Sequence, residues 1–163
     1  MVGKGGFMFL WQKRVFRWQL FTEKDFYTQF ILDLQECKNE VIIESPYITT
    51  SRMERLYPVF RELLTRRVKV HIITRDPIDH DGHFRHQATN EILKCNEMGL
   101  NVIMLKGNHH RKLAIIDRKI LWEGSLNILS YNHSQEIMRR IEEKEIANQM
   151  YHFLKLDRYL NIQ

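Results

Sequence analysis

Six residues that together can bind and attack a phosphate lie within eighteen positions of this chain. They are His110, Lys112, Asp117, Gly124, Ser125 and Asn127, spaced as HxK, four residues, D, six residues and GSxN. A neutral imidazole such as that of His110 can attack phosphorus and leave again, so that one difficult displacement becomes two easier ones. The ammonium of Lys112 offers a compact positive charge to the non-bridging oxygens, where charge develops in the transition state. The pattern therefore predicts a phosphate site that contains its own nucleophile.

The other members of the pattern are expected to complete that site. Ser125 and Asn127 offer hydrogen bonds to the same oxygens, and Gly124 permits close approach of the backbone. If residues 110–116 form a strand, the imidazole and the ammonium project from one face, because strand side chains alternate. The same alternation turns Asp117 away from them, so we expect its carboxylate to orient the loop instead of contacting substrate. A hairpin return after this residue brings the two halves of the motif together.

The elements that must position this motif alternate between strand-like and helix-like stretches. Strands are predicted at residues 41–44, 68–74, 100–105, 110–116, 119–122 and 136–141. Helices are predicted after an N-cap at Thr22, near 53–64, from about 85 to a terminating Gly99, and near 146–154. Pro58 interrupts the second helix, so its regular part is expected to begin near Tyr57. This order predicts an α/β fold with a mixed, largely parallel sheet flanked by helices on both faces.

The chain is expected to divide into an N-terminal segment at residues 1–21 and a catalytic domain at residues 22–163. The segment mixes phenylalanine and tryptophan with lysine and arginine, and it lacks the organisation of a signal peptide. We expect it to form an edge strand or a dimer contact. Attachment to a membrane interface is the alternative, since aromatic and basic residues together favour that position.

The charge balance favours an anionic partner. The formal net charge is +5 and the pI is about 9.3, which suits nucleic acid or an acidic membrane surface; charge that only keeps the protein soluble is the alternative. No apolar run reaches the roughly 18 to 20 residues that span a bilayer. Cys37 and Cys95 lie in apolar stripes without zinc-site spacing, so we expect buried thiols and a cytoplasmic protein, with a single disulfide between them as the alternative.

The motif resembles the HKD signature of the phospholipase D superfamily, whose members break or transfer phosphodiester bonds. The resemblance implies a phospholipase D-like fold and a covalent phosphohistidine on His110. It also implies that a downstream glutamate bonds the other ring nitrogen of the nucleophile, and Glu136 stands where that residue is expected. The chemistry of the superfamily needs no metal, so we expect neither a metal nor a cofactor.

This chain carries one HKD motif, whereas the superfamily mechanism uses two histidines. One attacks phosphorus, and the other protonates the leaving oxygen and later activates water. No lysine stands two positions after His109, so it does not begin a second motif. We therefore expect a symmetric homodimer in which His110 and its mate face each other across the twofold axis. Such an arrangement is similar to the single-motif endonucleases and restriction nucleases of the superfamily.

Residues outside the motif are further candidates for substrate binding. Tyr47 and Trp122 flank predicted strand ends, where they either stack on bases or pack in the core or an interface. Arg75, at the start of a predicted loop, is also expected to bind substrate. The segment 79–86 contains the residue types of a metal site, but its spacing matches no zinc or calcium motif. We interpret it as a solvated turn or as a loop that contacts a nucleic-acid backbone.

The leading hypothesis is a metal-independent nuclease that cleaves DNA or RNA in a site shared across a homodimer. The chain's basic charge, its small size and the lack of a clear membrane anchor favour this reading over a lipid substrate. A phospholipase or transphosphatidylase is the enzymatic alternative. The alternative from another class is a catalytically silent nucleic-acid-binding domain that belongs to a larger helicase or restriction assembly.

Overall fold

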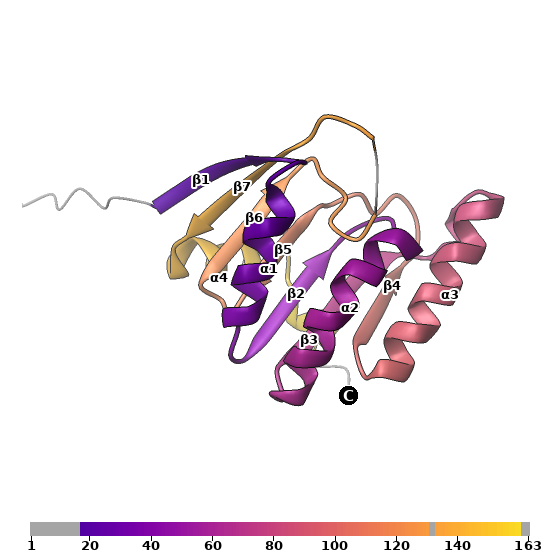
Figure 1. Cartoon of the computed structure of the whole chain (residues 1–163), viewed down its shortest axis with the longest axis horizontal. Coiled ribbons are helices and arrows are strands. Elements are labelled where there is room, and N and C mark those ends of the chain that lie inside the picture. Colours follow the sequence, from indigo (N-terminus) through magenta and orange to yellow (C-terminus); the bar gives the residue numbers. More distant parts are fainter. Residues whose placement is uncertain (1–16, 131–132, 161–163) are drawn as a thin grey trace, which may run out of the picture.

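Short apolar strands and amphipathic helices alternate along the computed structural model, which describes residues 17–130 and 133–160 (Figure 1). The strands are β1 (Arg17–Thr22), β2 (Glu40–Glu44), β3 (Lys69–Arg75), β4 (Asn101–Leu105), β5 (Leu113–Ile116), β6 (Ile120–Gly124) and β7 (Ile137–Glu142). The helices are α1 (Phe26–Glu36), α2 (Thr50–Thr65), α3 (Gly82–Met98), α4 (Lys144–Phe153) and α5 (Asp157–Leu160), with a 3-10 turn η1 at Pro77–Asp79. Most of the expected N-terminal segment, residues 1–16, lies outside the described residues, and its last residues belong to β1.

All seven strands form one sheet in the order β1-β7-β6-β5-β2-β3-β4. The pairs β2–β3 and β3–β4 are parallel, because α2 and α3 carry the chain back between them. The pairs β2–β5, β5–β6, β6–β7 and β7–β1 are antiparallel. The mixed sheet with helices on both faces is confirmed, but it is not largely parallel. The tight turn between β5 and β6 leaves no room for a crossover helix, so the second half of the chain adds antiparallel strands.

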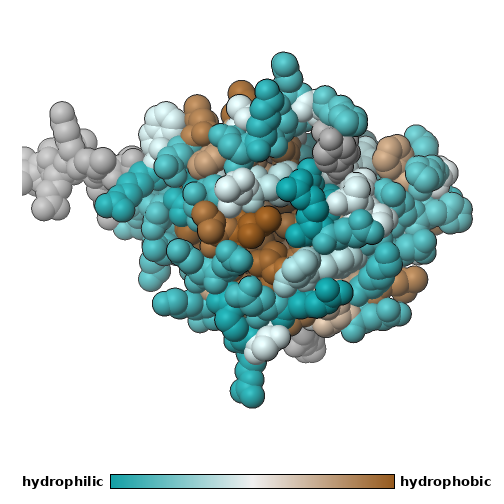
Figure 2. Space-filling view, viewed as in Figure 1, coloured by the Kyte–Doolittle hydropathy of each residue, from teal (hydrophilic) through white to brown (hydrophobic). Residues whose placement is uncertain are grey.

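The helices cover the two faces of the sheet with separate cores. Helices α1, α2 and α3 pack on one face, over a core that includes Phe30, Phe60 and Trp122 (Figure 1). Helix α4 covers the other face, over a smaller core that includes Ile42. Figure 2 shows the face of α1–α3 as largely hydrophilic, with a small apolar hollow near its centre. Because β2 is buried on both faces, its sequence is the unbroken apolar run Val41–Ile43 instead of an alternating one.

Helix α2 runs without interruption through Pro58, so the expectation that its regular part begins near Tyr57 is wrong. Pro58 lies on the exposed side of the helix. Buried residues such as Met53 and Phe60 hold the helix against its neighbours before and after the proline. Packing on both sides of Pro58 therefore outweighs the hydrogen bond that its missing N–H removes.

The first helix also begins later than expected. Thr22 is the last residue of β1, and Asp25 takes the N-cap position before Phe26. Both the backbone N–H and the hydroxyl of Thr22 donate to Asp25 Oδ1, at 2.6 and 2.9 Å. The expected N-cap residue thus closes the turn between strand and helix, because its hydrogen-bonding groups are engaged by the aspartate.

Two alternatives left by the sequence are settled by burial and bonding. Cys37 and Cys95 are buried and unbonded to each other, so the disulfide is excluded. Trp122 is fully buried and donates its indole N–H to Asp33 at 2.7 Å, which makes it a core residue. Within residues 17–130 and 133–160, no helix combines the length and apolarity needed to cross a membrane.

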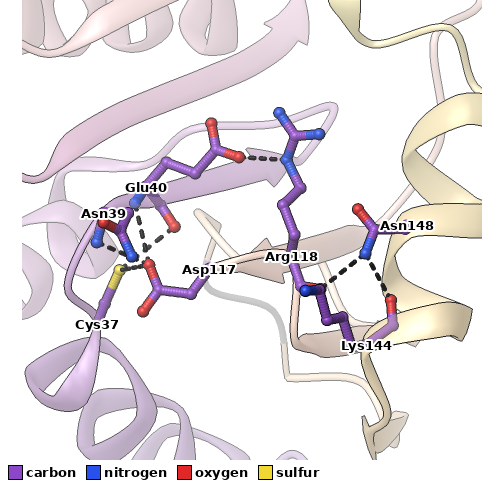
Figure 3. Close-up of polar contacts among 7 residues, drawn as sticks. All are labelled: Cys37, Asn39, Glu40, Asp117, Arg118, Lys144 and Asn148. Carbon is purple, nitrogen blue, oxygen red and sulfur yellow. Dashed lines mark hydrogen bonds and ion pairs between the residues drawn. The ribbon is translucent and has the colours of Figure 1, made fainter.

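A three-residue connection, 117–119, joins β5 to β6, and the Lys119 N–H donates to the Ile116 carbonyl oxygen at 2.9 Å across Asp117 and Arg118. Both residues have positive φ, 51° and 52°, as tight hairpin turns of this kind require. The Asp117 carboxylate accepts a hydrogen bond from the backbone amide of Lys38 (2.8 Å). It also accepts from the backbone amides of Asn39 (2.7 Å) and Glu40 (3.1 Å) (Figure 3). Burial alone would raise the pKa of this carboxyl, but the three amide donors outweigh it and lower the pKa. Asp117 thereby ties the hairpin to the start of β2.

Replacement of Asp117 by asparagine should lower the free energy of unfolding by about 2 kcal/mol, because charge-assisted bonds are lost while asparagine still tolerates positive φ. Urea denaturation at neutral pH measures this loss. Since folding lowers the pKa of Asp117, its stabilisation is complete above the unfolded value of about 3.9 and disappears as the pH falls through the folded value. The gap between wild type and Asp117→Asn should therefore narrow in acid, and a gap independent of pH would contradict this account.

Candidate active site

His110 and Lys112 lie in the segment that leads into β5 and not within the strand, because β5 begins at Leu113. Its partner β2 ends at Glu44, which pairs with Leu113, so earlier residues have no strand beside them on that side. The Lys112 ammonium donates to His110 Nδ1 at 2.8 Å and to the His110 carbonyl oxygen at 2.9 Å. The two side chains therefore lie on one side of the segment, as alternation predicts, although no strand forms there.

Arg111 stands between these two residues and turns the other way. Its Nε and one Nη donate to the two carboxylate oxygens of Glu44, at 2.5 and 3.2 Å. Glu44 is fully buried at the end of β2. Burial raises the pKa of Glu44, and the hydrogen bonds and charge of Arg111 offset only part of that rise. This buried pair fixes the backbone from which His110 and Lys112 project.

His109 is packed inside the protein in neutral form. Burial, together with the positive charge of Arg111, lowers the pKa of His109 to about 4. Its Nε2 lies 3.6 Å from the Glu44 carboxylate, but a neutral ring at this distance makes no ion pair. Of the two adjacent histidines, only His110 is exposed. The structure thus separates a buried histidine from an accessible one.

Lys112 is partly buried, and its charge is influenced by Glu136. Burial lowers the pKa of the Lys112 ammonium, while the Glu136 carboxylate acts in the opposite direction. The carboxylate of Glu136 accepts a hydrogen bond from the Ser134 hydroxyl at 2.6 Å, and its backbone N–H donates to Glu23 at 3.0 Å. Glu136 therefore lies within electrostatic range of the motif. Its hydrogen bond to the nucleophile stays a prediction.

Pairing of β5 with β6 brings the GSxN segment beside the HxK segment. The backbone N–H of Gly124 donates to the Lys112 carbonyl oxygen at 3.3 Å. A Cβ at position 124 would lie 2.1 Å from the Ile137 carbonyl oxygen and 2.9 Å from Met138 Cα, so only glycine fits. The close approach that Gly124 permits in this structure is with the backbone of β7, and its expected contact with substrate stays a prediction.

Ser125 and Asn127 lie in a bend after β6, so the expected alternation of an extended segment does not apply to them. The Ser125 hydroxyl accepts from the Ile137 N–H at 3.1 Å, and the Ser125 N–H donates back to the Ile137 carbonyl at 3.0 Å. Asn127 is 8% exposed, and its Oδ1 has no hydrogen-bond partner among the described residues. The bend therefore ties Ser125 to β7 and leaves one end of the Asn127 amide available.

Tyr47 and Arg75 lie at the same end of the sheet as the motif. The Tyr47 ring is 6.3 Å from the His110 ring and nearly perpendicular to it. Arg75 is the last residue of β3, and together with Tyr47 and Asn127 it lines a pocket of about 480 Å³. Asp117 is the exception among the predicted residues, because it follows β5 whereas His110 precedes it. The extended chain between them measures about 20 Å.

An open groove of about 590 Å³ runs beside His110 and Lys112. One side of it is apolar and is formed by four residues of β1, β7 and α4 and its end, which we call the apolar shelf: Leu20, Ile137, Met150 and Leu154. Leu20 and Ile137 are 59% and 60% exposed. On the polar side, Arg139 forms an ion pair with Glu123. The candidate nucleophile thus borders an apolar surface that is open to solvent.

Glu44 and Arg111 are site residues that the sequence reasoning missed. The signal was present in the chain: the alternation that places His110 and Lys112 together must place Arg111 on the opposite side. Glu44 also stands out as a carboxylate at the end of an apolar strand. A buried carboxylate needs a positively charged partner, so Arg111, which points inward, could have been predicted to pair with Glu44.

Replacement of Arg111 by methionine should lower the free energy of unfolding by about 3 kcal/mol at pH 7, because it leaves the buried Glu44 carboxylate unpaired. Glu44→Gln removes the buried charge itself and leaves an arginine that reaches water, so its loss should be about 1 kcal/mol. Because folding raises the pKa of Glu44, the loss in Arg111→Met should grow as the pH rises through the folded value. Chemical denaturation from about pH 4 to about pH 8 measures both variants, because this range begins near the ordinary glutamate pKa of about 4.3. Equal losses in the two would contradict the buried pair.

Known proteins share this fold. Residues 30–156 match the family described as cardiolipin synthase, PLD-like domain. NucT from Helicobacter pylori has a TM-score of 0.69 and 22% identity, over 86% of this chain and 94% of that one. Nuc, a phospholipase D family member from Salmonella typhimurium, has a TM-score of 0.70 and 16% identity, over 89% and 95%. Phosphatidylserine synthase from Haemophilus influenzae has a TM-score of 0.68 and 16% identity, over 90% and 40%.

Among curated protein sequences, none matches this chain significantly. The identities to solved structures are low, so these structures establish a common fold. The family match spans more than half of the chain, including the HxK and GSxN segments. This chain therefore belongs to the phospholipase D superfamily, through its PLD-like domain.

Proposed function

We propose that this chain is a phosphodiesterase that cleaves DNA or RNA through a covalent phosphohistidine on His110. The observation that carries the proposal is the placement of three groups at one end of the hairpin. The Lys112 ammonium lies 2.8 Å from the His110 ring, and the Lys112 carbonyl oxygen accepts from the first residue of GSxN, Gly124. An imidazole, an ammonium and a polar backbone turn are the groups that can bind a tetrahedral anion and attack it.

Lys112 changes partners in this scheme when a phosphate arrives. Its ammonium bonds His110 Nδ1 in the protein alone. Phosphate oxygens are charged and accept stronger hydrogen bonds, so the ammonium turns to them and releases Nδ1. While Nδ1 accepts from the ammonium, the proton of the neutral ring is on Nε2. Once Nδ1 is released, Nε2 gives its proton to water and Nδ1 takes one from water; the expected contact of Nδ1–H with the Glu136 carboxylate holds this tautomer and leaves the Nε2 lone pair to attack phosphorus. Ser125 and Asn127 are proposed to bind the same oxygens.

The displacement needs a second imidazole. As the bond from Nε2 to phosphorus forms, the bond from phosphorus to the leaving oxygen breaks, and that oxygen takes a proton from a general acid. Water then attacks phosphorus, gives its proton to the same group and displaces His110. His109 does not fill this role, because it is packed against Glu44 with a pKa of about 4. We infer that the partner subunit's His110 supplies the proton in a symmetric homodimer.

The apolar shelf supports a second copy at this place. Leu20 and Ile137 are exposed at the groove that also contains His110. A twofold axis beside His110 would bury one shelf against its equivalent and bring two imidazoles to one phosphate. Apolar side chains gathered beside a polar site are typical of such contact surfaces. Attachment to a larger helicase or restriction assembly stays a prediction.

Nucleic acid is the preferred substrate because the net charge is +5. A phospholipid is the second candidate, since the apolar shelf lies directly beside His110 and Lys112. In that case the shelf would contact acyl chains, and phosphatidylserine synthase shares the fold. For the nuclease, a second copy of the chain would cover Leu20 and Ile137; for the phospholipase, acyl chains would cover them. The reaction proposed for either substrate uses no metal and no cofactor.

Purified wild type and His110→Ala should be incubated with labelled single- and double-stranded DNA and RNA in excess EDTA. Wild type is expected to cleave, and His110→Ala should be slower by about a thousandfold or more, because it lacks the nucleophile. Lys112→Met should lose about a hundredfold, since it lacks the charge that stabilises the transition state. The matched control is Lys69→Met, an exposed lysine at the other end of the sheet, which should keep wild-type activity.

Each other result points to a named alternative. Cleavage that EDTA abolishes and magnesium restores would contradict the metal-independent mechanism. Cleavage of phosphatidylglycerol in vesicles without cleavage of nucleic acid would favour the phospholipase. Salt-dependent binding of DNA without cleavage would favour a silent binding domain.

Leu20→Asp should convert a dimer into an inactive monomer, because it places a charge on the apolar shelf without touching the motif. Light scattering measures the mass, and the EDTA assay measures a loss of about a hundredfold or more. Leu93→Asp is the control, since Leu93 is 54% exposed on α3 and away from the groove. A monomeric protein with full activity would refute the shared site.

A further inference from the structure

The pocket lined by Tyr47, Arg75 and Asn127 adjoins the motif, and of these three residues the proposed mechanism uses only Asn127. It has a volume of about 480 Å³, and its lining also includes His80, Phe84 and the acidic residues Asp79 and Asp81. Pockets of this size are large enough for a small organic ligand. Its walls come from the loop after β2, the end of β3, the start of α3 and the bend after β6. Four separate segments thus converge beside the nucleophile.

Three polar atoms of the pocket residues are buried without a hydrogen-bond partner among the described residues. They are Arg75 Nε, His80 Nε2 and Asn127 Oδ1. His80 and Asn127 are only 5% and 8% exposed. A buried polar atom without a partner costs about 1–3 kcal/mol, so native proteins keep few of them. Their collection around one pocket indicates a ligand that provides the partners.

Aromatic rings form a row from the nucleophile into this pocket. The Tyr47 ring lies 6.3 Å from the His110 ring, 4.9 Å from the His80 ring and 6.3 Å from the Phe84 ring. Phe84 lies in the first turn of α3 and is 50% exposed, so part of its aromatic ring is open to a ligand. Exposed aromatic faces beside a basic residue are typical of sites that stack an unpaired base.

We propose that this pocket binds one unstacked base of a single-stranded nucleic acid, next to the phosphate that His110 attacks. The inference rests on the proposed function, because a base is expected here only if the substrate is a nucleic acid. Tyr47 contacts both regions, so one nucleotide can reach from the motif into the pocket. A duplex substrate would have to unpair and unstack a base before inserting it, which a single strand avoids in part.

The orphaned atoms favour guanine as that base. Burial lowers the pKa of His80 and the Arg75 charge lowers it further, so the ring is neutral. The ring also bonds the Arg75 backbone, which makes the other nitrogen, Nε2, an acceptor. Asn127 Oδ1 is a second acceptor and Arg75 Nε is a donor. Guanine presents two N–H groups and one carbonyl oxygen on its Watson–Crick edge, which matches two acceptors and one donor.

Short oligothymidylates with one central nucleotide varied test this proposal. The centre is guanine, adenine, cytosine, thymine or an abasic residue, and cleavage of the flanking bonds is measured in excess EDTA. The bond next to guanine should be cut about tenfold faster than that next to thymine, and the bond next to the abasic residue about tenfold slower, since stacking and edge bonds are each worth about a factor of ten. Phe84→Leu should reduce the guanine-to-abasic ratio about tenfold, because it keeps an apolar side chain without an aromatic face. Leu93→Ala on the same helix is the matched control and should leave the ratio unchanged.

A binding measurement with the inactive variant tests whether the pocket binds a base, independently of cleavage. His110→Ala should quench the fluorescence of an oligothymidylate with a central 2-aminopurine, and His110→Ala with Phe84→Leu should not. Cleavage without base dependence would overturn the pocket and leave the proposed function standing. Quenching without any cleavage by wild type would overturn the proposed function and leave the base-binding pocket standing. A ranking with another base at the top would overturn the hydrogen-bond assignment, and absence of quenching would overturn the stacking.

Discussion

The hairpin of β5 and β6 fixes the distance between the two halves of the motif, and the site depends on its register. At one end, Gly124 donates to the backbone of Lys112; at the other, the Asp117 carboxylate binds two amides just before β2 and the first amide of β2. Between these ends, β5 is buried on both faces. A shift by one residue would exchange apolar side chains between the two cores and separate the halves of the motif, so burial enforces the register. The remote Asp117 thus acts on the site through the hairpin.

Alternation continues past the end of the strand and sorts the adjacent residues into anchors and functional groups. His109 and Arg111 face the buried Glu44, whereas His110 and Lys112 contact each other on the opposite side. This segment has no strand beside it on the side of β2, so the Glu44–Arg111 pair holds it there. Such a pair is a costly way to hold a backbone, because the Glu44 carboxylate loses its water. Its cost is consistent with a segment in which the positions of two side chains matter more than stability.

The sequence predicted what periodicity and motif spacing control, and failed where tertiary contacts decide. The apolar runs located β2 and β3, Gly99 ended α3 with a φ of 98°, and HxK and GSxN were brought together as expected. Pro58 did not break α2, because packing on both sides outweighed a local preference. The start of β5 was misplaced, because strand length depends on where β2 ends and not on the local residues.

The site was predictable only in part for the same physical reason. The spacing identifies motif members, but it does not show that Gly124 is required by the β7 backbone or that Ser125 is engaged by Ile137. The predominance of antiparallel pairs also escaped prediction, since the order of elements does not reveal which strands become neighbours. Contacts between residues distant in sequence are what these misses share.

Two unfavourable features flank His110, and each would be relieved by a different binding event. The apolar shelf exposes Leu20 and Ile137 to water, which a second copy would cover. The pocket lined by Tyr47, Arg75 and Asn127 contains buried polar atoms without hydrogen-bond partners, and the edge of a base would provide these partners. A chain that retained both only for folding would gain by replacing them with polar surface and apolar core. Their position on either side of one exposed imidazole is therefore better explained by assembly and substrate binding than by the stability of the single chain.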